Sequence, residues 1–248
     1  MIGVPTSLPI RRPRVTTVTL QLPGTPVSTW LETVSLPLLA ALLVAVPVFV
    51  QAPWVRVAPM AATLFTLPLV ALGVVLEQRA SGPWRRLGVL LVGFAGSWLG
   101  GSLFWGWFRL HPLWHLPIES FALPLALAGL GSRWRLAACF YLASLLGTAA
   151  TDAVMAAGGV MAFWPQVLAA APVQAPELLQ QAAAAALRPF PLTLILLSGT
   201  LLAGLCAALW RRDDPDSQVA AATLATTLAV DGMFLLAAAL APRLSGLI

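Results

Sequence analysis

Both histidines of the chain lie in one short segment that also carries an acidic and a basic residue. His111, His115 and Glu119 follow one another at intervals of four residues, and Arg109 precedes them. Residues four apart lie on one face of a helix, so this spacing predicts a stripe of two imidazoles and a carboxylate. Two prolines within the segment interrupt any regular helix, and the stripe is therefore approximate.

Two further carboxylates, Asp152 and Asp231, lie inside long apolar runs. A charged side chain in the middle of a membrane-spanning helix costs about 2.5–3.5 kcal/mol, so each of them needs a partner or a function. With the topology derived below and a rise of about 1.5 Å per residue, Glu119, Asp152 and Asp231 all lie about 9–15 Å from the outer surface. We therefore expect them to share one buried polar site with the histidine segment, in the outer half of a helical bundle.

Several chemistries fit such a site. Acids beside an imidazole suit a proton relay, because histidine titrates near neutral pH. Histidine, aspartate and glutamate also bind divalent metals, and a histidine can be the axial ligand of a haem or a chlorin. The residue types and their spacing do not distinguish a proton relay from a metal site or a haem or chlorin site. The chain lacks the HExxH, P-loop, GxSxG and Rossmann glycine patterns, so we expect no enzyme of a soluble type.

A purely structural role competes with these functions. Arg109 would then pair with Glu119 or Asp152, and Asp231 would accept a hydrogen bond from the nearby Thr226 or Thr227. Paired charges and hydrogen-bonded carboxylates are the usual way in which a membrane protein tolerates polar groups in its interior.

The composition indicates that membrane-spanning helices position these residues. Hydrophobic residues make up 59% of the 248 and charged residues only 9%, whereas soluble domains have about 25% charged residues. Only helices and closed barrels satisfy every backbone group in lipid, and long apolar runs without a two-residue period indicate helices. The predicted spans are 34–51, 57–76, 87–107, 113–131, 136–158, 190–210 and 218–241. The fourth contains two prolines and Glu119, which predicts a broken or tilted helix.

The positions of the arginines predict how the chain is oriented in the membrane, because the chain has no lysine and arginine carries all of its positive side-chain charge. With the N-terminus in the cytoplasm, ten arginines fall in the inner segments and four in the outer ones. This bias satisfies the positive-inside rule and requires all seven spans. The inner turn at 211–217 reads as a loop followed by a capped helix start. The scattered arginines also argue against a nucleic-acid partner, and we expect the bilayer to be the main one.

The expected domain organisation is simple. Residues 1–33 form a cytoplasmic tail, and residues 34–248 form one transmembrane domain with an outer loop and short helix at about 159–189. Gly96 and Gly100 form a GxxxG motif, which serves close helix packing within the chain or in a homo-oligomer. Cys139 and Cys206 show no metal-ligand spacing and are expected to be reduced.

Four short segments carry a resemblance to a known family. They are Gly106–Arg109, His115–Glu119 (sequence HLPIE), Gly147–Asp152 and Val230–Gly232. Over about residues 40–240 the chain resembles an uncharacterised family of cyanobacterial integral membrane proteins, a domain of unknown function. The resemblance implies a thylakoid or plasma membrane and brings no established activity.

Two functions follow as expectations. The first is a small carrier or permease for a proton, an ion or a small solute that uses the outer-half polar site. The second is a membrane scaffold or an assembly factor of a photosynthetic complex, with or without a bound pigment. Converging acids favour the carrier, and the absence of a visible internal repeat favours the scaffold.

Overall fold

Helices make up the described part of the chain. A computed structural model describes residues 35–244 and contains no strand in that range. The predicted all-α membrane bundle is confirmed. The predicted tail, residues 1–33, lies outside the described residues.

Within residues 35–244, six helices are long and apolar enough to cross a membrane. Each has 21 or more residues, and about 20 suffice for a hydrocarbon core of ~30 Å. They are α2 (Leu36–Val57), α3 with α4 (Pro59–Leu64 and Thr66–Arg79), α5 with the π-helix η1 (Gly82–Leu103 and Phe104–Phe108), α8 (Arg135–Ala157), α11 (Pro189–Trp210) and α12 (Pro215–Leu244).

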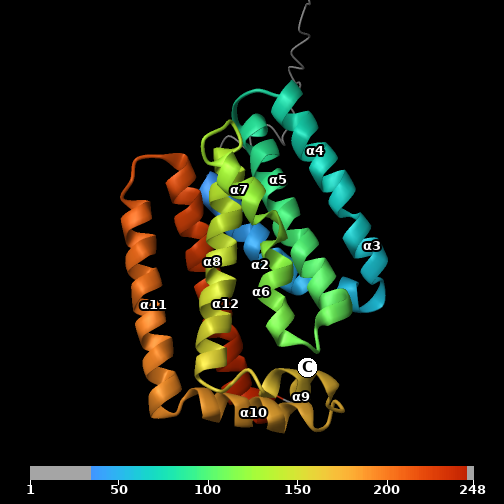
Figure 1. The fold of residues 1–248 in the computed structure, drawn as a ribbon, viewed down its shortest axis with the longest axis vertical. Coiled ribbons are helices and arrows are strands. Elements are labelled where there is room, and N and C mark those ends of the chain that lie inside the picture. The colour runs from blue at the N-terminus through green and yellow to red at the C-terminus, as the bar shows by residue number, and fades with distance from the viewer. Residues whose placement is uncertain (1–34, 245–248) are drawn as a thin grey trace, which may run out of the picture.

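The predicted fourth span is a broken helix. It consists of η2 (Pro112–Trp114), α6 (His115–Glu119), η3 (Ser120–Ala122) and α7 (Leu123–Gly129). Figure 1 shows α6 and α7 following one another along the bundle. Prolines stand in the first turn of η2 and of α7, where the missing N–H costs no helical hydrogen bond. The seven predicted spans are thus six long helices and one interrupted helix.

The helix α5 is the most buried of the long helices in the described bundle. It packs against α4, α8 and α2, and 61% of its most apolar stretch is buried, compared with 6% for α11. Trp98 on α5 packs edge-on against Trp54 and Phe65, and its indole N–H donates to the carbonyl oxygen of Ala62 at 2.8 Å. That carbonyl lies just before the break at Phe65, so Trp98 contributes a hydrogen bond at the kink between α3 and α4.

The two ends of the bundle differ. The turns that precede α5, α8 and α12 lie at one end (Figure 1), which we call the arginine end because these turns and the adjoining helix ends carry most of the described arginines. At the other end, α9 (Phe163–Ala169) and α10 (Ala175–Ala186) lie across the bundle, and we call it the capped end. A short outer helix was predicted where α10 lies; α9 was missed, because seven residues around a proline have no clear period.

The start of α12 is capped as predicted. One oxygen of Asp214 accepts hydrogen bonds from the backbone N–H groups of Asp216 and Ser217, at 3.1 and 3.3 Å. The Ser217 hydroxyl donates to the other oxygen, and this hydrogen bond lowers the pKa of the Asp214 carboxyl below its ordinary value. The cap fixes where the chain turns back into the bundle.

The arrangement of the ends predicts opposite accessibility for two exposed positions. In a variant with both cysteines replaced by serine, an impermeant maleimide added to intact cells should label Val173→Cys at the capped end. It should label Ser81→Cys at the arginine end only after the cells are opened. The reverse pattern, or equal labelling of both, would mean that the positive-inside rule gives the wrong orientation here.

Candidate functional site

The imidazole of His115 lies between two carboxylates from different helices. Its Nδ1 is 3.1 and 3.0 Å from the two carboxylate oxygens of Asp152 on α8. Its Nε2 is 3.3 Å from Oε1 of Glu119, one turn later on α6. All three side chains are less than a fifth exposed. The predicted meeting of the fourth and fifth spans at one level is therefore present in the structure.

Aromatic rings enclose the same imidazole. The ring centroid of Phe104 lies 4.3 Å from that of His115, Trp164 on α9 lies at 5.4 Å, and Trp105 lies at 6.3 Å. Phe104 and Trp105 open the π-helix η1, whose wider turn shifts the register of the residues that follow. Because these rings exclude water, the electrostatic interactions between His115 and the two acids are stronger than they would be at a surface.

Asp231 joins this region through a threonine. Oγ1 of Thr151 donates a hydrogen bond of 2.5 Å to Asp231 on α12, and Thr151 directly precedes Asp152 on α8. Gly147 lies one turn before Thr151, and a Cβ at Gly147 would come within 2.6 Å of Thr227, so the glycine allows α8 and α12 to approach.

The expected hydrogen bond from Thr226 or Thr227 to Asp231 is not formed. Both hydroxyls instead donate to backbone carbonyls one turn earlier on α12, those of Ala222 and Thr223. Such back-bonding is common for threonine in membrane helices, because it satisfies the hydroxyl without a second helix.

Two residues of the predicted cluster stand apart. The guanidinium of Arg109 forms no ion pair with any residue between 35 and 244, so its predicted pairing with Glu119 or Asp152 is wrong. His111 is exposed, because the chain turns between η1 and η2 and breaks the stripe of i, i+4 and i+8 residues. Arg109 contributes through its backbone, whose carbonyl oxygen accepts a 2.8 Å hydrogen bond from the indole of Trp164.

A tyrosine hydroxyl bridges the break in the fourth span. Tyr141 on α8 donates to the carbonyl oxygen of Glu119 and accepts from the backbone N–H of Ala122 at 3.2 Å. The first group directly precedes η3 and the second belongs to its last residue, so the hydroxyl spans the segment where the α-helical ladder is interrupted. Since no water is present in the hydrocarbon core, an interrupted helix needs such partners.

Gly96 and Gly100 make room for this arrangement. A Cβ at Gly96 would lie 3.1 Å from the Tyr141 ring, and one at Gly100 would lie 3.0 Å from Cα of Glu119. The GxxxG face of α5 therefore receives the broken span and the tyrosine that supports it. It packs within the chain.

Two buried polar residues outside the predicted cluster were missed. Glu77 at the end of α4 is 3% exposed and lies 3.1 Å from an Arg85 nitrogen and 3.6 Å from an Arg133 nitrogen. Gln51 on α2 is 7% exposed and donates to Ser102 at 2.7 Å and to the carbonyl oxygen of Trp98 at 2.6 Å. In the sequence, Glu77 looks like a solvent-exposed acid at the end of a span. The arginines of the adjoining and the following inner loop, which include Arg85 and Arg133, are the only sequence signal for an ion pair there.

The geometry is suited to moving a proton. Glu119 and Asp152 contact opposite nitrogens of one imidazole, so the ring can accept a proton on one side and release one on the other. The same geometry disfavours a shared metal ion, because the two acids face opposite edges of the ring. No group of three or more His, Cys, Asp or Glu side chains within residues 35–244 has an arrangement that could hold a metal. Neither ring nitrogen of His115 is free for a haem or chlorin.

The tyrosine bridge predicts a measurable stability difference. Tyr141→Phe removes a hydroxyl that donates to one half-buried backbone group and accepts from another, and the loss of these two hydrogen bonds should lower the free energy of unfolding by about 1–3 kcal/mol. Ser120→Ala is the control, because its hydroxyl only donates to the exposed carbonyl of Pro117 and its loss should cost less. Thermal unfolding in detergent would measure both, and equal stabilities would contradict the role of the bridge.

Comparison with known proteins identifies a family. No curated protein and no solved structure matches the chain. The family model described as a protein of unknown function (DUF3120) matches residues 40–239, which include every residue of the site described above. The protein therefore belongs to the DUF3120 family.

Proposed function

We propose that this protein is a small membrane carrier that moves a proton, an ion or a small solute through the site around His115. The observation that carries this proposal is the imidazole held between Glu119 and Asp152, one acid at each ring nitrogen. A structural ion pair needs one partner for each charge. Two acids on one imidazole leave a proton that can occupy more than one position, which is what a relay requires.

The surroundings of the site support the same function. Trp164, which contacts the His115 ring, belongs to α9, and α9 lies across the capped end of the bundle (Figure 1). The cap separates the site from the outer surface, so its movement would control access. The family resemblance suggests a thylakoid or plasma membrane of a cyanobacterium as the location, with the arginine end facing the cytoplasm.

Proton flux into liposomes tests this function directly. Protein reconstituted in vesicles with an internal pH-sensitive dye and a potassium diffusion potential should acidify the interior faster than empty vesicles do. Glu119→Gln and Asp152→Asn should slow this flux on the order of a hundredfold, the scale on which a positioned acid–base group acts. Glu177→Gln on α10 is the matched control, since that acid is exposed at the capped end.

The liposome experiment can either support or rule out proton movement through this site. Flux that equals that of empty vesicles under every gradient, or flux unaffected by both substitutions, would rule out a proton carrier that uses this site. Flux that appears only with a particular ion or solute on one side would identify what is carried with the proton.

The scaffold function is the second candidate, and the face of α11 favours it. This helix is the least buried of the six long ones, and Leu196, Leu197 and Leu201 are each more than half exposed. A Cβ at Gly199 or Gly204 would meet nothing within 4 Å, so small residues lie open on this helix. Open small residues allow another helix to approach closely in lipid.

A single substitution on α11 tests whether its exposed face contacts a partner protein or only lipid. Gly204→Leu has space in the isolated chain, so it should fold normally but enlarge the exposed face of α11. If the protein works as a scaffold in a homo-oligomer or a photosynthetic complex, this variant should migrate as a smaller species in native electrophoresis of mild-detergent extracts. Gly131→Leu, also in open space but in the turn before α8, is the control. Identical migration of the unaltered protein, Gly204→Leu and Gly131→Leu would contradict a partner on α11.

A further inference from the structure

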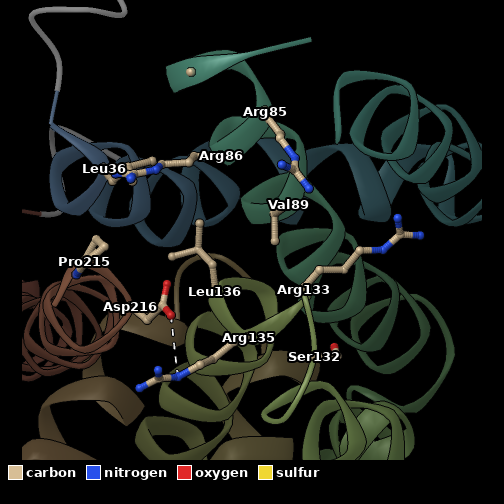
Figure 2. Close-up of a pocket in the computed structure, with 11 residues that line it drawn as sticks. Leu36, Arg85, Arg86, Val89, Ser132, Arg133, Arg135, Leu136, Pro215 and Asp216 are labelled. Atoms are coloured by element: carbon tan, nitrogen blue, oxygen red, sulfur yellow. Dashed lines mark ion pairs between the residues drawn. The ribbon is translucent and has the colours of Figure 1, made fainter. Parts of the chain in front are cut away.

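Four arginines line a pocket at the arginine end of the bundle. Arg85 and Arg86 come from α5, and Arg133 and Arg135 come from the turn before α8 and from the start of α8. Figure 2 shows that Arg86 extends past Leu36 on the side where Pro215 and Asp216 begin α12, that Arg85 lies beside Val89, and that Arg133 extends the other way. The pocket has a volume of about 520 Å³, within the range of small-molecule sites.

The charges of this pocket are not balanced. Arg85 and Arg133 share the single carboxylate of Glu77, and Arg135 lies 3.6 Å from Asp216 on the pocket wall and 4.0 Å from Asp214. Arg86 forms no ion pair with any residue in the described part of the chain. Four guanidinium groups thus lie near three carboxylates, and the one positive charge in excess attracts an anion.

The start of α5 adds to this attraction. Gly82, its first residue, lines the pocket, and no side chain caps that helix start. The N-terminus of a helix carries a partial positive charge and free N–H groups, which favour phosphate and carboxylate groups.

An apolar groove begins beside the pocket. It has a volume of about 490 Å³ and runs between α4, α5, α7 and α8, where Val70, Val92, Leu125 and Ala128 form part of its wall. Ser132 lines both hollows, so the groove and the arginine pocket both border the turn between α7 and α8. A charged pocket beside an apolar groove matches the two halves of a lipid molecule.

We propose that the arginine pocket and the apolar groove together bind one anionic phospholipid. Its phosphate lies at the start of α5, beside Arg85 and Arg86, and one acyl chain lies in the groove along α7. Basic pockets between membrane helices on the cytoplasmic side hold anionic headgroups in this way. The site is separate from His115, which lies toward the capped end of the same bundle.

Native mass spectrometry of the full-length protein in neutral detergent tests the site. Phosphatidylglycerol should be retained as one bound molecule at a lower lipid concentration than phosphatidylcholine with the same chains. Arg86→Gln should weaken phosphatidylglycerol binding about fivefold, the factor expected for one arginine near an anionic headgroup. Arg211→Gln is the matched control, because Arg211 is exposed at the same end and does not line the pocket.

The groove has its own test. Ala128→Phe should fill the groove and weaken phosphatidylglycerol binding, whereas Ala207→Phe on the exposed face of α11 should leave it unchanged. Equal retention of the two lipids, or an equal loss in Arg86→Gln and Arg211→Gln, would overturn the proposal. Glycerol 3-phosphate that displaces the lipid at similar concentrations would also overturn it, since the site would then serve a free phosphate compound.

Discussion

A membrane interior supplies no water to complete a hydrogen bond or to screen a charge, and the packing of this protein follows from that lack. The interrupted fourth span is supported by Tyr141, whose hydroxyl binds the backbone just before η3 and at the last residue of η3. Tyr141 can lie there because Gly96 leaves room for its ring. The same span carries His115 and Glu119, so the hydrogen bonds of Tyr141 also hold the segment that forms the polar site.

The two ends of the bundle solve the problem of buried charge differently. Near the capped end, one imidazole lies between two acids inside a wall of aromatic rings, so that one positive charge is shared by two carboxyl groups. At the arginine end, Glu77 is buried beneath guanidinium groups that are themselves more than half exposed. The first arrangement is mostly buried and suits proton exchange, whereas the second leaves positive charge facing outward.

The sequence predicted the architecture well because apolar length and arginine placement are strong signals in membranes. It also predicted that Glu119, Asp152 and Asp231 lie at one level, because depth along a helix follows from residue counting. Rotation about a helix axis was harder to predict. Prolines and the π-helix change the register between residues 104 and 115, so neither the exposure of His111 nor the aromatic enclosure of His115 could be read from spacing. Arg109 was expected to pair with an acid, and no such pair forms among the described residues.

The interruption at Ser120–Ala122 also has a mechanical consequence. A continuous α-helix resists bending because each turn is bonded to the next, but at η3 the ladder is interrupted and two side-chain hydroxyls, those of Tyr141 and Ser120, supply hydrogen bonds instead. The fourth span is therefore weakest against bending at η3. Its first part is held to α8 through His115 and Asp152, whereas α7 is held there by apolar packing on Ala138 and its neighbours.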